Sequence, residues 1–239
     1  GVVGCIAGFA GRESVISDCG NTSAIYSGIQ NNCSPDGGTY SFTCVGGILG
    51  AFDMNAAASS TGGTLTVSGC VNSGNFTLRR GASAGIVAYA RSAAMSDCTS
   101  TGNSGDYPHA SAGIAGKLEN SKVTGCRALG DIQAHSSPLY AGGLVAIGLS
   151  TDISGSRFFG KVGSSKESIE KLVYGAIAGK SDEGSRITDC LYGGMMRAVM
   201  ENGNATSGIN ATSANVANYV VGTGTPSVSG IGLWDGALE

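Results

Sequence analysis

The chain has 239 residues with a formal net charge of -3, and only 13 % of its residues are charged. This balance gives no reason to expect a nucleic-acid partner, and no run of about 18 apolar residues exists that could span a membrane. Glycine is abundant, with 41 copies, but an apolar fraction of 41 % is too high for a disordered chain. The length allows one or two domains with a sizeable core.

A short motif built around one aliphatic residue recurs six times. Its copies, in chain order, are Gly4-Cys5-Ile6-Ala7-Gly8, Gly46-Gly47-Ile48-Leu49-Gly50, Ala84-Gly85-Ile86-Val87-Ala88, Ala112-Gly113-Ile114-Ala115-Gly116, Gly142-Gly143-Leu144-Val145-Ala146 and Gly175-Ala176-Ile177-Ala178-Gly179. Each copy is too short for a helix, and its apolar residues are mostly β-branched or small. The motif therefore predicts a short strand in each of six repeats.

A second motif follows each copy of the first. It reads Ile16-Ser17-Asp18-Cys19, Val67-Ser68-Gly69-Cys70, Met95-Ser96-Asp97-Cys98, Val123-Thr124-Gly125-Cys126, Ile153-Ser154-Gly155-Ser156 and Ile187-Thr188-Asp189-Cys190. Ile16 and Cys19 are three residues apart, so plain alternation would put them on opposite faces. The third position is Asp or Gly in every copy, and both residue types tolerate the left-handed backbone of a turn. We expect a bend there, which lets Ile16 and Cys19 both point inward.

A third motif begins four residues beyond each cysteine or serine. Its copies are Ser23-Ala24-Ile25, Gly74-Asn75-Phe76, the weak copy Gly102-Asn103-Ser104, Gly130-Asp131-Ile132, Gly160-Lys161-Val162 and Gly194-Met195-Met196. Six copies of three linked motifs in one order indicate a repeat protein, in which each unit buries its apolar residues against the next.

The sequence thus predicts an all-β fold: a parallel β-helix, or β-solenoid, of six rungs with three short strands each. Six rungs make a column roughly 29 Å tall at the usual strand spacing, and right-handed coiling is the default for parallel crossovers. We assign residues 1–196 to the repeats. The step from Cys19 to Cys70 is 51 residues where the regular step is 28, which predicts insertions near 26–42 and 51–63. Such loops either carry recognition or are tolerated excursions.

The Gly-x-Ile-Ala-Gly, Ile-Ser-Asp-Cys and Gly-Asn/Asp-Ile/Phe series resembles the GLUG-motif repeat proteins of bacterial cell surfaces. The resemblance covers residues 1 to about 196. It implies a cell-surface or secreted location and a role around adhesion, and some members are regions of immunoglobulin-cleaving metallopeptidases. It carries over no catalytic residue, because the peptidase motif His-Glu-x-x-His is absent and His109 and His135 are the only histidines.

Five of the eight cysteines fall in one column of the repeat, with a serine in the sixth place. This structural ladder consists of Cys19, Cys70, Cys98, Cys126, Ser156 and Cys190. A column that accepts serine asks for a small buried side chain, and stacked Cβ vectors run parallel rather than converge, so we expect reduced thiols. The spacing does not match a zinc site, and we expect no metal or other cofactor. Cys33 and Cys44 lie outside the ladder and are candidates for a loop disulfide.

The acidic residues of the bend column raise the possibility of an enzyme. Asp18, Asp97 and Asp189 lie two and three rungs apart, roughly 10 and 14 Å at the usual strand spacing. Paired carboxylates of glycosidases lie about 5 to 9.5 Å apart. The exchange of Asp with Gly favours a turn role instead, so we assign no catalytic residue and expect no enzyme.

Two aromatic residues occupy one column of adjacent rungs. Phe158 and Tyr192 could stack on a sugar ring, but alternation from Ser156 and Cys190 points both of them inward. Core filling is therefore the favoured interpretation. Phe159 should face outward.

The predicted first strand has apolar residues on both faces. One side presents Ile6, Ile48, Ile86, Ile114, Leu144 and Ile177, and the other presents Ala7, Leu49, Val87, Ala115, Val145 and Ala178. A flat apolar strip usually marks a contact surface. We expect the repeat-two insertion, another segment or a second molecule to cover it. The alternative is that backbone bends turn both columns into a narrow core.

Residues 197–239 break the pattern of the repeats. An open solenoid end leaves unpaired strand edges, so we expect this segment to cap the last rung, with Trp234 packed near the sixth repeat. Gly1 enters directly into a strand motif, and we expect the native protein to continue upstream.

Three functions of different classes are compatible with these patterns. The favoured one is a non-catalytic binding or adhesion module that recognises a glycan or a protein. The second is a passive spacer within a longer surface protein. The third is a β-helix carbohydrate enzyme, which is the least favoured because the charged residues are scattered rather than clustered.

Overall fold

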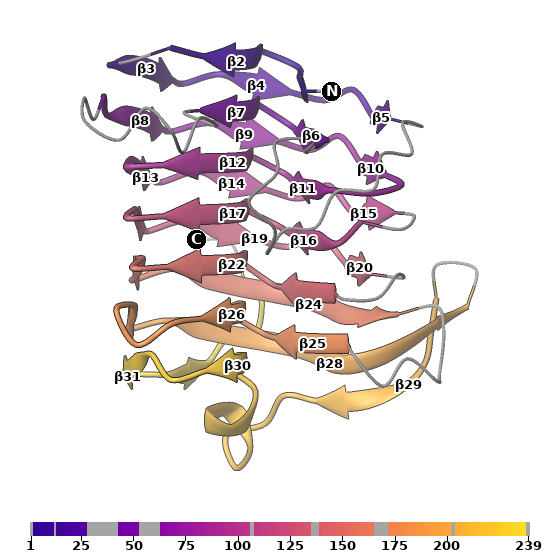
Figure 1. The fold of residues 1–239 in the computed structure, drawn as a ribbon. Helices are drawn as coiled ribbons and strands as arrows, with labels where there is room; N and C mark the ends of the chain where they lie inside the picture. The colour runs from indigo at the N-terminus through magenta and orange to yellow at the C-terminus, as the bar shows by residue number, and fades with distance from the viewer. Residues whose placement is uncertain are drawn as a thin grey trace.

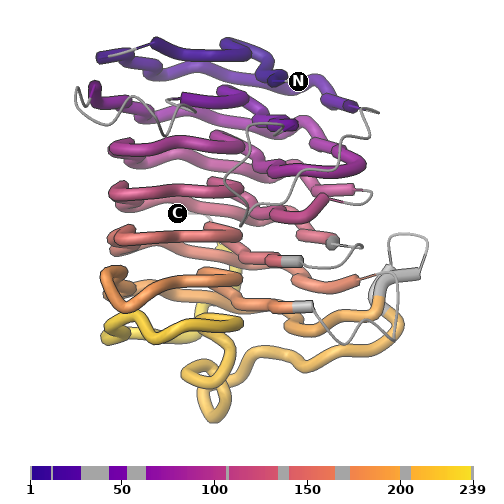
Figure 2. The backbone as a smooth tube through the Cα atoms, in the orientation of Figure 1, coloured from indigo at the N-terminus to yellow at the C-terminus, as the bar shows by residue number. Residues whose placement is uncertain are grey.

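The computed structural model describes residues 2–11, 13–27, 43–52, 63–105, 108–134, 139–164, 172–201 and 204–237. The chain coils into a parallel β-helix in which each turn stacks on the one before it, as Figure 1 and Figure 2 show. The N-terminal turn lies at one end of the stack and the C-terminal turns at the other. The predicted all-β solenoid is therefore confirmed.

The first rung contains five short strands, where the sequence predicted three. They are β1 (Val2–Gly4), β2 (Ala7–Ala10), β3 (Ser14–Ser17), β4 (Gly20–Asn21) and β5 (Ile25–Ser27). Each of these strands begins one sheet of the solenoid, and we name the sheets A to E in that order. The difference arises because each motif spans a corner of the rung, so that its residues belong to the ends of two strands.

Sheets A, B and C run along the whole stack. After β1, sheet A contains β6 (Cys44–Gly46), β11 (Ala82–Ala84), β16 (Ala110–Ala112), β21 (Leu139–Gly142) and β25 (Leu172–Gly175). After β2, sheet B contains β7 (Leu49–Phe52), β12 (Val87–Arg91), β17 (Ala115–Glu119), β22 (Val145–Leu149), β26 (Ala178–Ser181) and β30 (Val221–Gly224). After β3, sheet C contains β8 (Leu65–Ser68), β13 (Ala93–Ser96), β18 (Lys122–Thr124), β23 (Asp152–Ser154), β27 (Arg186–Thr188) and β31 (Ser227–Ser229).

Sheets D and E complete the cross-section. After β4, sheet D contains β9 (Val71–Asn72), β14 (Thr99–Ser100), β19 (Arg127–Ala128), β24 (Arg157–Ser164), β28 (Leu191–Glu201) and β29 (Asn204–Asn210), with β32 (Gly232–Leu233) also paired to β28. After β5, sheet E contains β10 (Phe76–Leu78) and β15 (Ser104–Gly105), while β20 (Ile132–Ala134) pairs with β24. A short 3-10 helix, η1, spans Val216–Asn218.

The first motif forms the corner between sheets A and B, and both of its apolar columns point into the core. Ile86 and Val87, from the two columns, are fully buried in one cluster, as are their counterparts in the neighbouring rungs. The expected contact strip is therefore wrong, and the alternative of inward bends holds. Small residues make this possible: a Cβ at Gly143 would lie 2.3 Å from Cγ of Phe158 on the opposite wall.

The second motif forms the corner between sheets C and D, as predicted. Its third position has a left-handed backbone in every rung, with φ between 52° and 66° for Asp18, Gly69, Asp97, Gly125, Gly155, Asp189 and Gly230. A comparable corner separates sheets B and C, where Ser92, Asn120 and Ser150 also have positive φ. That corner has no cysteine column to mark it, and the sequence did not predict it.

The C-terminal segment adds a partial seventh rung rather than only a lid. β30, β31 and β32 pair in parallel with β26, β27 and β28, and Val228-Ser229-Gly230-Ile231 takes the register of the second motif. Ile231 replaces cysteine there, which is why the repeat was missed. Trp234 is buried, with 6 % of its surface exposed, and its backbone N–H donates to the carbonyl of Tyr192 in the sixth rung. Before this turn, β29 runs antiparallel to β28 and closes the edge of sheet D.

Candidate functional site

The strands of sheet D become longer toward the C-terminal rungs of the solenoid. Its early strands β4, β9, β14 and β19 have two residues each, whereas β24 has eight and β28 has eleven. The two long strands continue past the third-motif corner, so that they pair with β20 and β29 as well. They provide a broad outward surface in the last rungs, with side chains aligned in columns from rung to rung.

The first outward column of this surface is aromatic and apolar. The register brings Leu129, Phe159, Gly193 and Trp234 into line on successive rungs. Gly193 carries no side chain, so the rings of Phe159 and Trp234 meet above it edge to face, with centroids 6.4 Å apart. A Cβ at Gly193 would lie 2.8 Å from Cδ2 of Phe159. The absence of a side chain at Gly193 therefore allows the two rings to make contact.

The pair of rings formed by Phe159 and Trp234 makes two further contacts. Arg157, two residues earlier on β24, places its guanidinium 5.9 Å from the centroid of the Trp234 ring. The chain after Trp234 turns back over Phe159, where a Cβ at Gly236 would lie 2.8 Å from Cγ of the Phe159 ring. Phe159 remains partly exposed. A partly exposed ring fixed in place keeps its orientation without a further loss of rotamer freedom on binding.

The second outward column begins as a polar ladder at the third-motif corner. In this ladder each side-chain oxygen accepts a hydrogen bond from the backbone N–H one rung further on. Asn103 N donates to Asn75 Oδ1 at 2.9 Å, Asp131 N donates to Asn103 Oδ1 at 2.8 Å, and Lys161 N donates to Asp131 Oδ1 at 2.9 Å. Lys161 carries no acceptor, so the ladder ends there, and Met195 follows on β28.

An open ion pair marks the end of this ladder. Lys161 Nζ lies 3.6 Å from Asp131 Oδ2, and their side chains are 37 % and 28 % exposed. That separation is longer than a direct charged hydrogen bond, which is about 2.7 to 2.9 Å. Both groups therefore keep capacity for another polar partner.

A pocket of about 290 Å³ lies between the two columns. Leu129 and Phe159 form one wall, and Asp131, Lys161, Met195 and Asn210 form the other, with Gly160 and Gly194 between them. Met195 pairs with Asn210 of β29, so the antiparallel strand supplies the end of the second wall. The pocket thus combines apolar walls with an acceptor, a cation and an amide, which is the composition of a small-molecule binding site.

The inner face of the same strands is a packed aromatic core. Phe158 and Tyr192 are fully buried, so the core-filling interpretation is confirmed, and Phe159 faces outward as predicted. Tyr192 donates its hydroxyl proton to the carbonyl of Val216 in η1. Burial raises the pKa of Tyr192 to about 12, so the hydroxyl stays protonated and keeps this bond. The pocket therefore lies over a packed interior.

The cysteine ladder is structural and lies away from the pocket, at the corner between sheets C and D. Cys19, Cys70, Cys98, Cys126 and Cys190 are free thiols. Each thiol of this column donates to the carbonyl two residues earlier, as Cys98 does to Ser96 at 3.3 Å, and Ser156 makes the same bond to Ser154 at 3.0 Å. This shared bond explains why serine replaces cysteine. Cys33 lies outside the described residues, so the candidate disulfide between Cys33 and Cys44 is not tested here.

Three of the ladder thiols, Cys70, Cys98 and Cys190, are poor nucleophiles. Burial raises the pKa of Cys70 to about 11 and that of Cys190 to about 11. A hydrogen bond with the Cys126 side chain, together with burial, raises the pKa of Cys98 further. The nucleophilic thiolate of these three cysteines is therefore scarce at neutral pH.

The acidic bend column has a turn geometry. The Asp side chains lie over a glycine in the following rung: a Cβ at Gly69 would meet Asp18 Oδ1 at 2.3 Å, and one at Gly125 would meet Asp97 Oδ1 at 2.6 Å. Asp189 lies over Gly230 in the same way. Each Asp of this column is thus followed by Gly in the next rung, where a Cβ would collide with the Asp side chain. The positive φ values of the column agree with the turn interpretation.

Other kinds of site find no support in the described part of the chain. Within it, no three His, Cys, Asp or Glu residues gather closely enough to hold a metal ion. The same residues include no helix with the length and apolarity needed to cross a membrane.

Sequence reasoning placed the pocket residues in motifs but did not bring them together. Asp131, Lys161 and Met195 belong to successive copies of the third motif, and Asn210 lies in the segment expected to be a cap. The available signal was the change from Asn and Asp to Lys and Met in one column.

Comparisons with protein families, with curated proteins and with solved structures find no match for this chain.

Proposed function

We propose that this chain is a non-catalytic binding module of a bacterial cell-surface or secreted protein, and that it recognises carbohydrate through the pocket on the outer face of sheet D. The observation that carries the proposal is the pairing of a fixed, partly exposed aromatic ring, Phe159, with the open ion pair of Asp131 and Lys161. Sugars present apolar C–H faces and many hydroxyls, which match such a surface.

Two further features support a binding role. The resemblance of the repeats to GLUG-motif proteins implies a surface or secreted location and adhesion. The pocket also lies where the regular columns of the repeat are interrupted, on the long strands β24 and β28. A scaffold that acted only as a spacer would have no need for that interruption.

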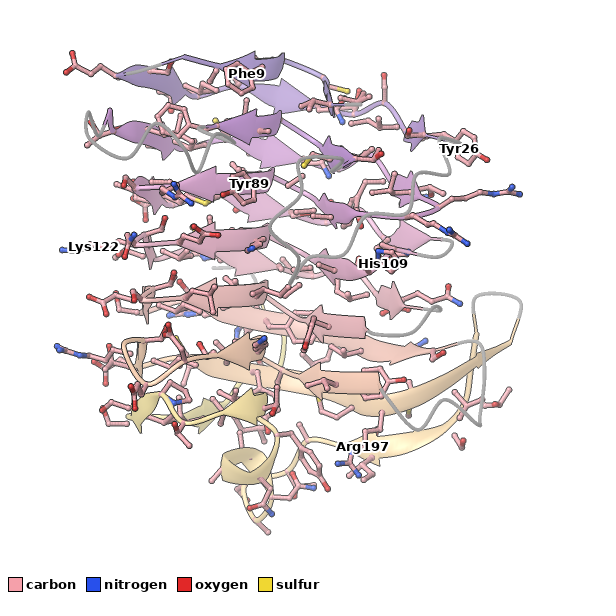
Figure 3. All side chains as sticks on the ribbon, in the orientation of Figure 1. Phe9, Tyr26, Tyr89, His109, Lys122 and Arg197 are labelled. Atoms are coloured by element: carbon pink, nitrogen blue, oxygen red, sulfur yellow. The ribbon has the colours of Figure 1, made fainter. Side chains whose placement is uncertain are left out.

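A glycan array probed with the whole chain tests the proposal. We expect a defined set of saccharides to bind, and we expect Lys161→Met to lose that binding because it removes the cation while keeping an apolar stem. Met195 already occupies the same column one rung later, so the substitution suits the fold. The matched control is Lys122→Met on the outer face of sheet C, at the position labelled in Figure 3.

Each result of the array bears on the proposal. Loss of binding in the Lys161 variant with full binding in the Lys122 variant supports it. An array without any bound saccharide would contradict it and favour the passive spacer. Equal binding by both variants would place carbohydrate recognition outside this pocket.

A further inference from the structure

The chemistry of the pocket narrows the class of sugar, on the premise that the proposed carbohydrate-binding function is right. One wall offers an acceptor and a donor next to each other. Asp131 Oδ1 already accepts from the backbone of Lys161, whereas Oδ2 faces Lys161 Nζ at 3.6 Å. An amide group placed beside them could donate its N–H to the carboxylate and accept from the ammonium through its carbonyl. Both charged groups would then be satisfied.

The opposite wall, formed by Leu129 and Phe159, is apolar, and Met195 adds an apolar side chain at one end of the polar wall. Leu129 and Phe159 face Met195 across the glycine backbone of Gly160 and Gly194. These side chains offer no hydrogen bond other than the weak acceptor of the Met195 thioether. They therefore favour a methyl group over a hydroxyl, because a hydroxyl buried against them would lose its hydrogen bonds to water.

The two walls together match one substituent of common sugars. We infer that the pocket binds the acetamido group of an N-acetylated hexosamine, with its methyl between Leu129, Phe159 and Met195 and its amide against Asp131 and Lys161. The pocket volume of about 290 Å³ fits one sugar unit of a longer glycan rather than a chain of units. Phe159, fixed by Trp234 and Gly236, forms the constant part of the site.

Two other ligand types fit less well. A plain hexose presents hydroxyls on every side and would leave the apolar wall without a partner. An apolar side chain from a protein partner would fill that wall but would remove water from the Asp131–Lys161 pair without replacing its hydrogen bonds, which is unfavourable. The acetamido group satisfies both walls at once.

The single tryptophan of the chain makes the test direct. Trp234 is the only tryptophan, and its ring contacts Phe159, so its fluorescence reports on the pocket. The probes are diacetylchitobiose, the corresponding glucosamine disaccharide without acetyl groups, and cellobiose. Each is titrated into the whole chain by fluorescence and calorimetry. We expect diacetylchitobiose to bind about tenfold or more tightly than the other two, the effect of one lost hydrogen bond to a charged group.

The matched variant is Asp131→Asn. Asparagine keeps the Oδ1 acceptor that the Lys161 backbone needs, as Asn75 and Asn103 do earlier in the same ladder. It replaces the acceptor Oδ2 by a donor, so we expect about tenfold weaker binding of diacetylchitobiose with an unchanged melting temperature. Asp152→Asn on sheet C is the control and should bind normally.

The outcomes separate the two proposals. Equal binding of cellobiose and diacetylchitobiose, with both weakened by Asp131→Asn, would overturn the acetamido assignment and leave carbohydrate recognition by the pocket standing. If none of the three disaccharides binds, and peptides that carry apolar side chains bind instead, both proposals are wrong. Binding of diacetylchitobiose that Asp131→Asn does not change would also overturn the acetamido assignment.

Discussion

The first and last rungs of sheet D use the same positions for different purposes. In the early rungs the inward column holds Asn21 and Asn72, which bond to each other at 2.7 Å, and the outward corner column forms the polar ladder that starts at Asn75. In the last rungs the inward position holds Phe158 or Tyr192, and the outward one holds Lys161 or Met195. Parallel pairing runs without a break from β4 to β28, which joins the two regions.

This contrast shows that the β-helix backbone can continue without the polar ladders of the early rungs. The polar ladders of the early rungs are repeated bonds that any rung can extend. The late rungs give up these bonds, fill the interior with aromatic rings and lengthen their strands. The candidate site is found where the polar ladder ends, because the Lys161 and Met195 side chains no longer accept a ladder bond and are available for a ligand.

The largest effect should come from the aromatic interior of the late rungs. We expect Phe158→Ala to lower the free energy of unfolding by about 4 kcal/mol, because it leaves a cavity in a fully buried core. Phe159→Ala, on the neighbouring outward position, should cost much less, since that ring is partly exposed. Chemical denaturation measures both. Equal losses would show that the inner and outer faces of β24 do not differ as described.

A smaller effect should distinguish two glycines of the bend column. Gly125 and Gly155 both have positive φ, but only the Cβ added at Gly125 would meet the side chain of the preceding rung, Asp97. We expect Gly155→Ala to cost about 1 kcal/mol from the left-handed backbone alone, and Gly125→Ala to cost about 1 kcal/mol more from the added crowding.

The double variant Asp97→Gly with Gly125→Ala provides the control for this pair. It should recover the additional loss of Gly125→Ala, because it removes the carboxylate that the new methyl group meets. Thermal or chemical unfolding of the single and double variants measures the coupling. If the losses simply add, the packing rule between Asp and the next glycine is wrong.

The smallest effect concerns two ion pairs. In one, Arg91 and Glu119 are in direct contact at 2.7 Å, and in the other, Lys161 and Asp131 are 3.6 Å apart. On sheet B, Glu119 accepts from Arg91 Nη2 at 2.7 Å and lies 3.1 Å from Lys117 Nζ. Burial alone would raise the pKa of Glu119, but the hydrogen bond from Arg91 and the nearby Lys117 outweigh it and hold the pKa below its usual value. A lowered folded-state pKa stabilises the fold above the unfolded pKa, and this contribution is lost as pH falls through the folded pKa.

We therefore expect Glu119→Gln to lower stability by about 1 kcal/mol or less at pH 7, and the difference to shrink as pH falls below about 4.3, the ordinary pKa of Glu. Asp131→Asn, between β19 and β20, should leave stability at pH 7 unchanged, because the charged groups of its ion pair are 3.6 Å apart and its ladder bond is kept. Urea unfolding as a function of pH gives both results. A stability loss for Asp131→Asn equal to that of Glu119→Gln would show that the two ion pairs contribute equally to the free energy of unfolding.

The repeated part of the fold could be predicted because its constraints recur. The bend at Asp18 and its equivalents, the inward Cys19 column and the outward Phe159 followed from spacing and alternation alone. The strip along Val87 was misjudged, because alternation assumes a straight strand and the motif spans a corner. The seventh rung was missed because Ile231 fills the cysteine position with a residue that makes no thiol bond.

The candidate site could not be predicted to the same extent. It depends on the contact between Phe159 and Trp234 across the gap at Gly193, and on the antiparallel return of β29 that brings Asn210 beside Met195. Neither feature repeats along the chain. A single sequence reveals a column when it recurs, whereas a contact made once between distant segments leaves no periodic signal.

The cysteine column has a consequence for how such a chain can change in length over generations. Each thiol bonds to a carbonyl of its own rung, as Cys126 does to Thr124. A rung therefore brings both partners of its corner bond with it when a gene segment is duplicated. A stack fastened by cross-links between rungs could gain or lose units only in matched pairs. Here a duplicated rung keeps its own corner bond, and the further contact that Cys70, Cys98 and Cys190 make with a backbone carbonyl of the preceding rung can be supplied by any rung that carries the same motif.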